Sequence, residues 1–229
     1  PRPDFGLRGV LQTALRAPAE RSEIDGLGYL GAVVDHPVTK GNLSRGSRLP
    51  FRRYVPVRAA GAEVLARRIG MLERPLGHNV IGRETEDPTA LAGTFGDGRA
   101  VYFPAFVDEI YREAGYPGLR RLIAGAVEWT ARDPLPIELD VPRSVEVNVF
   151  TGPQKAIVHI ANFTVDSQDA RDFPERLVRL EDVPVKLRLA EGRRVAAVTM
   201  LQTGRRLEPE VQGEYLSFTV PEVRDYAAI

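Results

Sequence analysis

The side chains with the strongest claim to chemistry are a short run of acids that follows an apolar strand. Asp108, Glu109 and Glu113 come just after Arg99–Pro104, which we predict to be a strand that a proline ends. Carboxylates at a strand end are common in the active sites of α/β folds. The same acids also suit the first turn of a helix, where they complement its dipole. A hydrolase with an acidic site near Asp108 and Glu109 is therefore only our third hypothesis.

Other catalytic and metal-binding patterns are missing from the sequence. The chain has no cysteine, which excludes disulfides, thiolate nucleophiles and cysteine-containing metal sites. None of its histidines, His36, His78 and His159, has a second ligand at metal-binding spacing on a shared face. We interpret His36 as a turn residue and His159 as a hydrogen-bonded residue of a sheet. We therefore predict no catalytic residue, no metal and no cofactor.

Four aromatic side chains are candidate stacking platforms for a sugar. Trp129 falls near the C-terminal end of a predicted helix, where it can serve either as a half-buried packing residue or as a platform. The candidate carbohydrate contacts are Trp129, Tyr111, Tyr116 and Tyr215.

Composition and charge exclude several classes of partner. The 31 basic and 31 acidic residues balance, which argues against a nucleic-acid binder because affinity for phosphate backbones rests on concentrated positive charge. No apolar run approaches the roughly 20 residues that a membrane span needs. No signal-peptide pattern opens the sequence, so we expect a cytoplasmic protein.

A helix with one apolar stripe is the clearest element of the first half of the chain. It follows Pro117, which suits a first helical turn because a missing N–H costs little there. We expect the stripe to be buried against a sheet that contains Val101 and Phe103. The members of the stripe are Leu119, Leu122, Ile123, Ala126 and Val127.

A change of hydrophobic period divides the chain. Asp133-Pro134-Leu135-Pro136 ends the helical pattern, and alternation with a period of two follows, most clearly over Val183–Leu189. Short strands separated by turn signals indicate a β-sandwich over 135–229, after an α/β domain over 1–134. Asn162-Phe163-Thr164 fits the N-glycosylation pattern, which we interpret as a chance match.

Two segments carry a family resemblance. Gly98–Pro104, a glycine and an arginine followed by a short apolar strand, and Gly115–Trp129, the predicted helix with its preceding turn, resemble the end of the β-galactosidase trimerisation-type domain of multidomain glycoside hydrolases. That domain has a class I glutamine amidotransferase-like fold, so the resemblance implies a partial flavodoxin-like α/β layer over 1–134. Further segments fit the same domain or the C-terminal β-sandwich of these enzymes, namely Asp4–Leu7, Asp35–Pro37, Phe51–Val57, Val158–Thr164, Val183–Leu189 and Tyr215–Pro221.

The resemblance implies a non-catalytic role in structure or oligomer formation. In those enzymes a separate barrel carries the catalytic carboxylates, and the amidotransferase cysteine has no counterpart here. We expect the chain to start partway through the domain, so that another copy, or the missing N-terminal part of the same protein, covers an open sheet edge between Gly28 and Val57 or the face beside Val101. The main alternative is a carbohydrate-binding accessory module.

Overall fold

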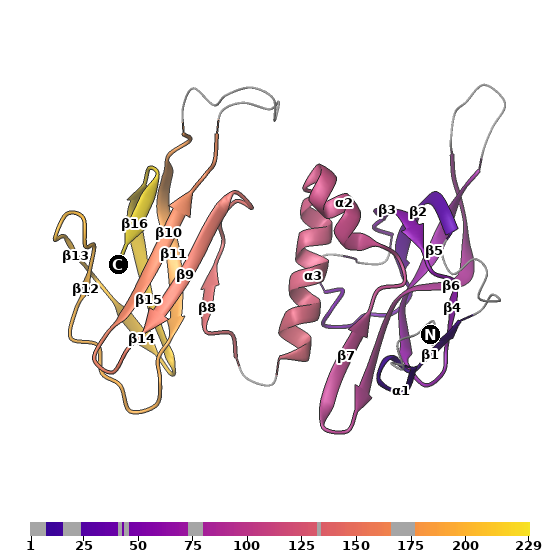
Figure 1. Cartoon of the computed structure of the whole chain (residues 1–229), viewed down its shortest axis with the longest axis horizontal. Helices are drawn as coiled ribbons and strands as arrows, with labels where there is room; N and C mark the ends of the chain where they lie inside the picture. Colours follow the sequence, from indigo (N-terminus) through magenta and orange to yellow (C-terminus); the bar gives the residue numbers. More distant parts are fainter. Residues whose placement is uncertain are drawn as a thin grey trace, which may run out of the picture. The chain divides into compact units, whose positions relative to one another are not determined.

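The structure is a computed structural model in which the chain forms two compact units, Pro1–Asp133 and Pro134–Ile229. It describes residues 8–15, 24–40, 43, 46–72, 80–131, 134–165 and 177–229. Helices occur in the first unit, and the second is built from strands (Figure 1). Within these ranges, no helix has both the length and the apolar character needed to cross a bilayer.

A five-stranded sheet, in the spatial order β3-β2-β5-β6-β7, is the framework of the first unit. The strands β1 and β4 form a separate small pair, and the helices α2 and α3 follow the last strand. The elements are α1 (Arg8–Leu11), β1 (Thr13–Leu15), β2 (Ile24–Ala32), β3 (Leu49–Tyr54), β4 (Val57–Ala59), β5 (Glu63–Leu72), β6 (Val80–Phe95), β7 (Gly98–Tyr102), α2 (Val107–Ala114) and α3 (Pro117–Thr130).

The direction of these strands corrects the fold that the resemblance implied. Every pairing in the five-stranded sheet is antiparallel; Gly28, for example, faces Phe51 of β3 on one side and Gly70 of β5 on the other. A flavodoxin-like layer would instead be parallel, with helical crossovers between its strands. The described part of the first unit is therefore an antiparallel sheet with helices packed on it, and not an α/β layer.

Local signals explain where the two longer helices begin and end. Gly115 follows α2 with a positive φ of 62°, and its N–H donates to the carbonyl of Tyr111 at 2.8 Å, which closes the last turn. Pro117 then occupies the first turn of α3. The Thr130 hydroxyl donates to the Ala126 carbonyl at 2.8 Å, and the backbone turns extended at Ala131.

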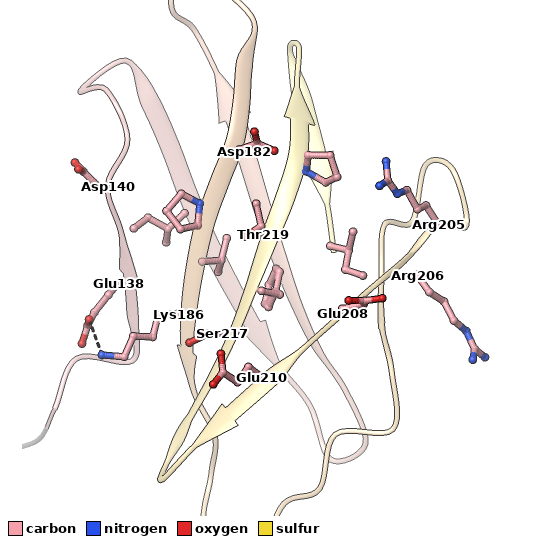
Figure 2. Close-up of a pocket in the computed structure, with 16 residues that line it drawn as sticks. Glu138, Asp140, Asp182, Lys186, Arg205, Arg206, Glu208, Glu210, Ser217 and Thr219 are labelled. Carbon is pink, nitrogen blue, oxygen red and sulfur yellow. Dashed lines mark hydrogen bonds and ion pairs between the residues drawn. The ribbon is translucent and has the colours of Figure 1, made fainter.

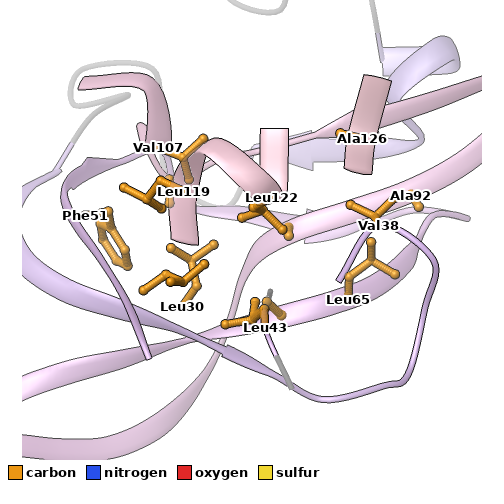
Figure 3. Close-up of a cluster of buried hydrophobic side chains, with 14 of the residues drawn as sticks. Leu30, Val38, Leu43, Phe51, Leu65, Ala92, Val107, Leu119, Leu122 and Ala126 are labelled. Carbon is orange, nitrogen blue, oxygen red and sulfur yellow. The ribbon is translucent and has the colours of Figure 1, made fainter. Parts of the chain in front are cut away.

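The apolar stripe of α3 packs into the core of the first unit (Figure 3). Leu119 and Leu122 are fully buried, and they share the core with Leu30 of β2 and Phe51 of β3. Val101 of β7 also packs against this core, as predicted, and so does Phe103, although it follows the strand and is not part of the sheet.

The prediction that Val127 is buried is wrong, because its side chain is 55% exposed. At about 100° per residue, the eight residues between Leu119 and Val127 place Val127 roughly 80° away from Leu119 around the helix. Leu122 and Ala126 fall on the opposite side of Leu119, so the buried face is centred away from Val127. Ile123, between Leu119 and Val127 around the helix, is half-buried.

The second unit is a β-sandwich, as the alternating pattern predicted. One sheet has the order β16-β10-β9 and the other β14-β15-β11-β8, with a small β12–β13 pair beside them; all pairings are antiparallel. The core between the sheets includes Val183, Val185 and Leu187, three of the alternating positions. The strands are β8 (Ile137–Leu139), β9 (Val145–Thr151), β10 (Ala156–Asn162), β11 (Leu180–Arg188), β12 (Val198–Thr199), β13 (Arg206–Leu207), β14 (Glu210–Gln212), β15 (Tyr215–Val223) and β16 (Tyr226–Ala228).

Two substitutions on α3 distinguish its buried face from its exposed face. Leu122→Ala should lower the free energy of unfolding by about 2–5 kcal/mol, because it leaves a cavity in a fully buried site. Val127→Ala on the same helix should change it by less than about 0.5 kcal/mol, because the side chain is mostly exposed. Urea denaturation of both variants measures the difference. Equal losses would contradict the orientation of α3.

Candidate functional site

Two of the three carboxylates in the acidic cluster, Glu109 and Glu113, form ion pairs with arginines of β3. Glu109, in the first turn of α2, accepts hydrogen bonds from Arg53 of β3: Nε lies 3.1 Å from each carboxylate oxygen, and Nη2 lies 2.8 Å from Oε1. The Glu109 side chain is only 13% exposed. Glu113 pairs with Arg52 at 3.1 Å, whereas Asp108 is exposed.

These pairs fix the electrostatics of the cluster. The hydrogen bonds from Arg53 lower the pKa of Glu109, and the positive charges of Arg53, Arg52 and Arg112 act in the same direction. A glycosidase needs one carboxyl group with a raised pKa that can donate a proton. Glu109 has the opposite shift and its oxygens are already engaged. The Arg53–Glu109 and Arg52–Glu113 pairs therefore tie α2 to β3, and the lowered pKa makes Glu109 a poor proton donor.

The aromatic candidates of the first unit do not form a common platform. Trp129 packs against the core, with the His36 ring 4.9 Å away edge-on and the Arg99 guanidinium 5.3 Å from the centre of the indole. Tyr116 is 41% exposed at the other end of α3, about 20 Å from Trp129 at 1.5 Å per residue. Tyr111, on α2, is half-buried against the core.

His36 is the turn residue that we predicted. It precedes the turn at 37–40, its carbonyl accepts the N–H groups of Thr39 and Lys40 at 2.9 Å, and its Nδ1 accepts the N–H of Val38 at 3.2 Å. Burial lowers the pKa of His36, and the negative charge of Glu63 raises it by a smaller amount. The ring therefore stays neutral at physiological pH and joins this turn to the end of α3.

Tyr215, the fourth aromatic candidate, lies in the second unit at the start of β15. Its hydroxyl donates to the Leu135 carbonyl at 3.1 Å, and the Lys186 ammonium lies 4.3 Å from the ring centroid. Lys186 also pairs with Glu138 at 3.0 Å. One face of the Tyr215 ring is thus occupied by a cation.

A polar hollow of about 930 Å³ lies over the β14-β15-β11-β8 sheet (Figure 2). Asp182 stands out on its wall, because it has a positive φ of 49° inside a strand, which few residues other than glycine and Asn or Asp adopt. The ladder between β11 and β15 pairs Glu181 with Glu222 and Val183 with Val220, and Asp182 has no partner in it; Pro221, between those two partners, has no N–H to donate. Its lining includes both carboxylates and cations, namely Glu138, Asp140, Asp182, Glu208, Glu210, Lys186, Arg205 and Arg206.

Sequence reasoning missed an aromatic cluster on the other sheet. Phe150 of β9 is 62% exposed and Tyr226 of β16 is 44% exposed. His159 of β10 stands between them, hydrogen-bonded through Nδ1 to the Tyr226 hydroxyl, with the Phe150 ring 5.2 Å away. This hydrogen bond confirms the prediction that His159 is a hydrogen-bonded residue of a sheet. The alternation of β9 places Phe150 on the same face as Glu146 and Asn148, and that signal was available in the sequence.

The remaining motifs have structural roles or lie outside the described residues. Asn162 is 1% exposed, and its amide donates to the carbonyls of Val178 and Arg224 at 2.8 and 2.7 Å, so it is not accessible to glycosylation in this fold. His78 and Asp4–Leu7 fall outside the described residues. Across the ranges that the structure covers, no three His, Asp or Glu side chains are grouped to hold a metal.

Comparison with known proteins finds the same fold in two carbohydrate-processing enzymes. Searches with the sequence match no protein-family profile and no curated protein. Alpha-L-fucosidase isoenzyme 2 from Paenibacillus thiaminolyticus matches 91% of this chain with a TM-score of 0.66 at 16% identity. The cold-adapted β-galactosidase from Rahnella sp. R3 matches 97% with a TM-score of 0.51 at 12% identity.

This chain shares its fold with part of a glycoside hydrolase. The match covers 33% of the fucosidase and 25% of the β-galactosidase, so the chain spans a third or less of either enzyme.

The Arg53–Glu109 pair predicts how stability depends on pH. Because the pKa of Glu109 is lowered in the folded state, the pair stabilises the protein above the ordinary carboxyl range and is lost as the pH falls through the folded-state pKa. Glu109→Gln should therefore destabilise the chain at neutral pH, and its difference from wild type should shrink between about pH 5 and 3.

Urea denaturation across this pH range measures the effect. The exposed Glu128 of α3 supplies the control, since Glu128→Gln should show a small difference at every pH. A Glu109→Gln difference that grows on acidification would contradict the assignment.

Proposed function

We propose that this chain is a non-catalytic, structural C-terminal region of a glycoside hydrolase and that it takes part in oligomer formation. The observation that carries the proposal is the extent of the fold likeness: it runs over 91% of this chain but over only 33% of the fucosidase. Under this proposal, the paired carboxylates that cleave the glycosidic bond belong to a separate catalytic domain. The ion pair between Glu109 and Arg53 supports the same proposal, because it lowers the pKa of the carboxyl group.

Within this proposal, the first unit is the counterpart of the trimerisation-type domain. Its support is the sequence motif at Gly98–Pro104 and Gly115–Trp129, which now correspond to β7 and to α3 with its preceding turn. The antiparallel sheet limits the correspondence to the end of that domain, because the parallel strands of an amidotransferase-like layer have no equivalent in the described residues.

The strand edge that we expected a partner to cover is partly closed within the chain. β2 lies inside the sheet, between β3 and β5. The segment after β7 then covers one end of β3: the Phe106 N–H donates to the Arg53 carbonyl, and the Val55 N–H donates to the Pro104 carbonyl, both at 2.9 Å. A partner is therefore better sought on a face of the sheet than along this edge.

Exposed apolar side chains on the sheet offer such a face. Ile81 of β6 pairs with Met71 of β5, and Leu27 of β2 precedes Gly28, the partner of Gly70. The register therefore places Leu27, Met71 and Ile81 near one another at the same end of three adjacent strands. Leu27 is 42% and Ile81 is 49% exposed. Apolar groups in adjacent, exposed positions are a feature of protein interfaces. We propose that another copy, or the remainder of the same protein, covers these side chains.

Light scattering on the purified chain tests the oligomeric part of the proposal. At tens of micromolar, the wild type should form a defined oligomer through an interface of about 1,000 Å² or more. Ile81→Glu should shift it toward monomer, because a carboxylate would be buried without a partner. Val127→Glu is the matched control: it also replaces an exposed apolar residue, 55% exposed on α3, and should leave the oligomer intact. A monomeric wild type would refute oligomer formation by this chain.

The second candidate is a carbohydrate-binding accessory module, which the polar hollow of Figure 2 favours. Carboxylates and guanidinium groups facing one space can share the hydroxyl groups of a sugar as acceptors and donors. Titration with galactose and fucose, followed by NMR, should then shift the amide signals around Asp182 and Arg205, and Asp182→Asn should weaken the shifts. Unchanged spectra at high sugar concentration would exclude this candidate.

A further inference from the structure

A second hollow, of about 710 Å³, opens at one end of the β-sandwich. The β9–β10 turn and the connection from β11 to β12 border it. Its walls include buried side chains of the core, contributed by both sheets: Val158, Leu187, Leu216, Phe218 and Ile229. Protein interiors are otherwise closely packed, so a space that reaches core side chains is unusual. Its volume is that of a small-molecule site.

Charged side chains surround the mouth of this hollow, and the positive ones are in excess. Lys155, Arg188, Arg193 and Arg194 face two acids, Glu191 and Glu214. Arg188 pairs with Glu214 at 3.2 Å, which neutralises one cation. The Arg193 guanidinium donates to the Gly152 carbonyl at 2.8 Å, which orients that side chain along the mouth.

Two cations remain available to a ligand. Among the residues that the structure describes, Lys155 and Arg194 are exposed and face no carboxylate within ion-pair distance. An arginine fork suits a carboxylate or sulfonate, and a lysine adds a mobile point charge. An apolar floor below and unpaired cations above are complementary to a molecule with an apolar body and an anionic head.

We propose that this hollow binds a small organic anion with an apolar body, with the body among Val158, Leu216 and Phe218 and the anionic group against Arg194 and Lys155. A neutral sugar would place hydroxyl groups against apolar walls, and an organic cation would meet the excess positive charge. The inference stands apart from the accessory role and does not depend on it.

Fluorescence titration of the full 229-residue chain with 8-anilinonaphthalene-1-sulfonate tests the proposal, because this probe has both features. We expect saturable binding of one molecule per chain in the micromolar range, and competition by decanoate. Arg194→Glu should weaken binding by about tenfold or more, since it removes a charge-assisted contact and adds a repulsion. Ala197→Trp, which fills the hollow from its wall, should also weaken it.

The matched control is Arg143→Glu, an equal change of charge at an exposed turn before β9 that does not line the hollow. It should bind like the wild type, and thermal melting by circular dichroism should confirm that every variant is folded. Absence of saturable binding, equal affinity in all variants, or equal competition by neutral decanol would overturn the proposal. So would light scattering that shows Arg194→Glu dissociating an oligomer, because the hollow would then be an interface between copies.

Discussion

The close approach of α3 to the rest of the first unit is the constraint on which that unit depends. Two glycines allow it. A Cβ at Gly125 would lie 2.8 Å from the Val38 carbonyl oxygen, and one at Gly118 would lie 2.5 Å from Leu49. With hydrogen in place of a side chain, the helix axis can lie near the sheet, and Leu119 and Leu122 reach its core. The His36 turn and the Arg99–Trp129 contact then fix the C-terminal end of the helix.

The acidic cluster is a consequence of the same packing. Because α2 lies against β3, its first turn places Glu109 beside Arg53, and the charges satisfy each other in a partly dehydrated position. Glu109 held in this way strengthens the contact between helix and sheet, and its lowered pKa makes it a poor proton donor. Under the proposed accessory role, the chain acts through its exposed faces and the two hollows of the sandwich.

Sequence periodicity predicted the elements better than their arrangement. The stripe of α3 and the alternation of β11 were recognisable because burial imposes a period on one face of an element. The direction of β2 relative to its neighbours was not recognisable. An apolar run fits a buried strand of either direction, and the pairing of β2 with β3 and β5 joins residues that are distant in sequence. The wrong prediction for Val127 has a similar cause. Whether a residue at the edge of an apolar helix stripe is buried depends on which neighbouring element covers it, and the sequence of the helix does not contain that information.

The candidate sites were less predictable for a physical reason. Both hollows are lined partly by segments too short to show a hydrophobic period, such as the two-residue strand β13 with its neighbours Arg205 and Glu208, and the residues before β12. Tyr215 was identified from its type alone, and the structure places a lysine over its ring. Phe150, by contrast, could have been found, because it shares a parity with polar residues of β9 and so had to point outward.

The most direct measurement for the account is turnover of chromogenic galactosides and fucosides by this chain alone. The proposed accessory role predicts a rate equal to that of a buffer blank across the pH range in which the chain is folded. Hydrolysis above the blank that Asp108→Asn or Glu109→Gln abolishes, while the variant stays folded, would contradict a non-catalytic role and place the chemistry in the acidic cluster.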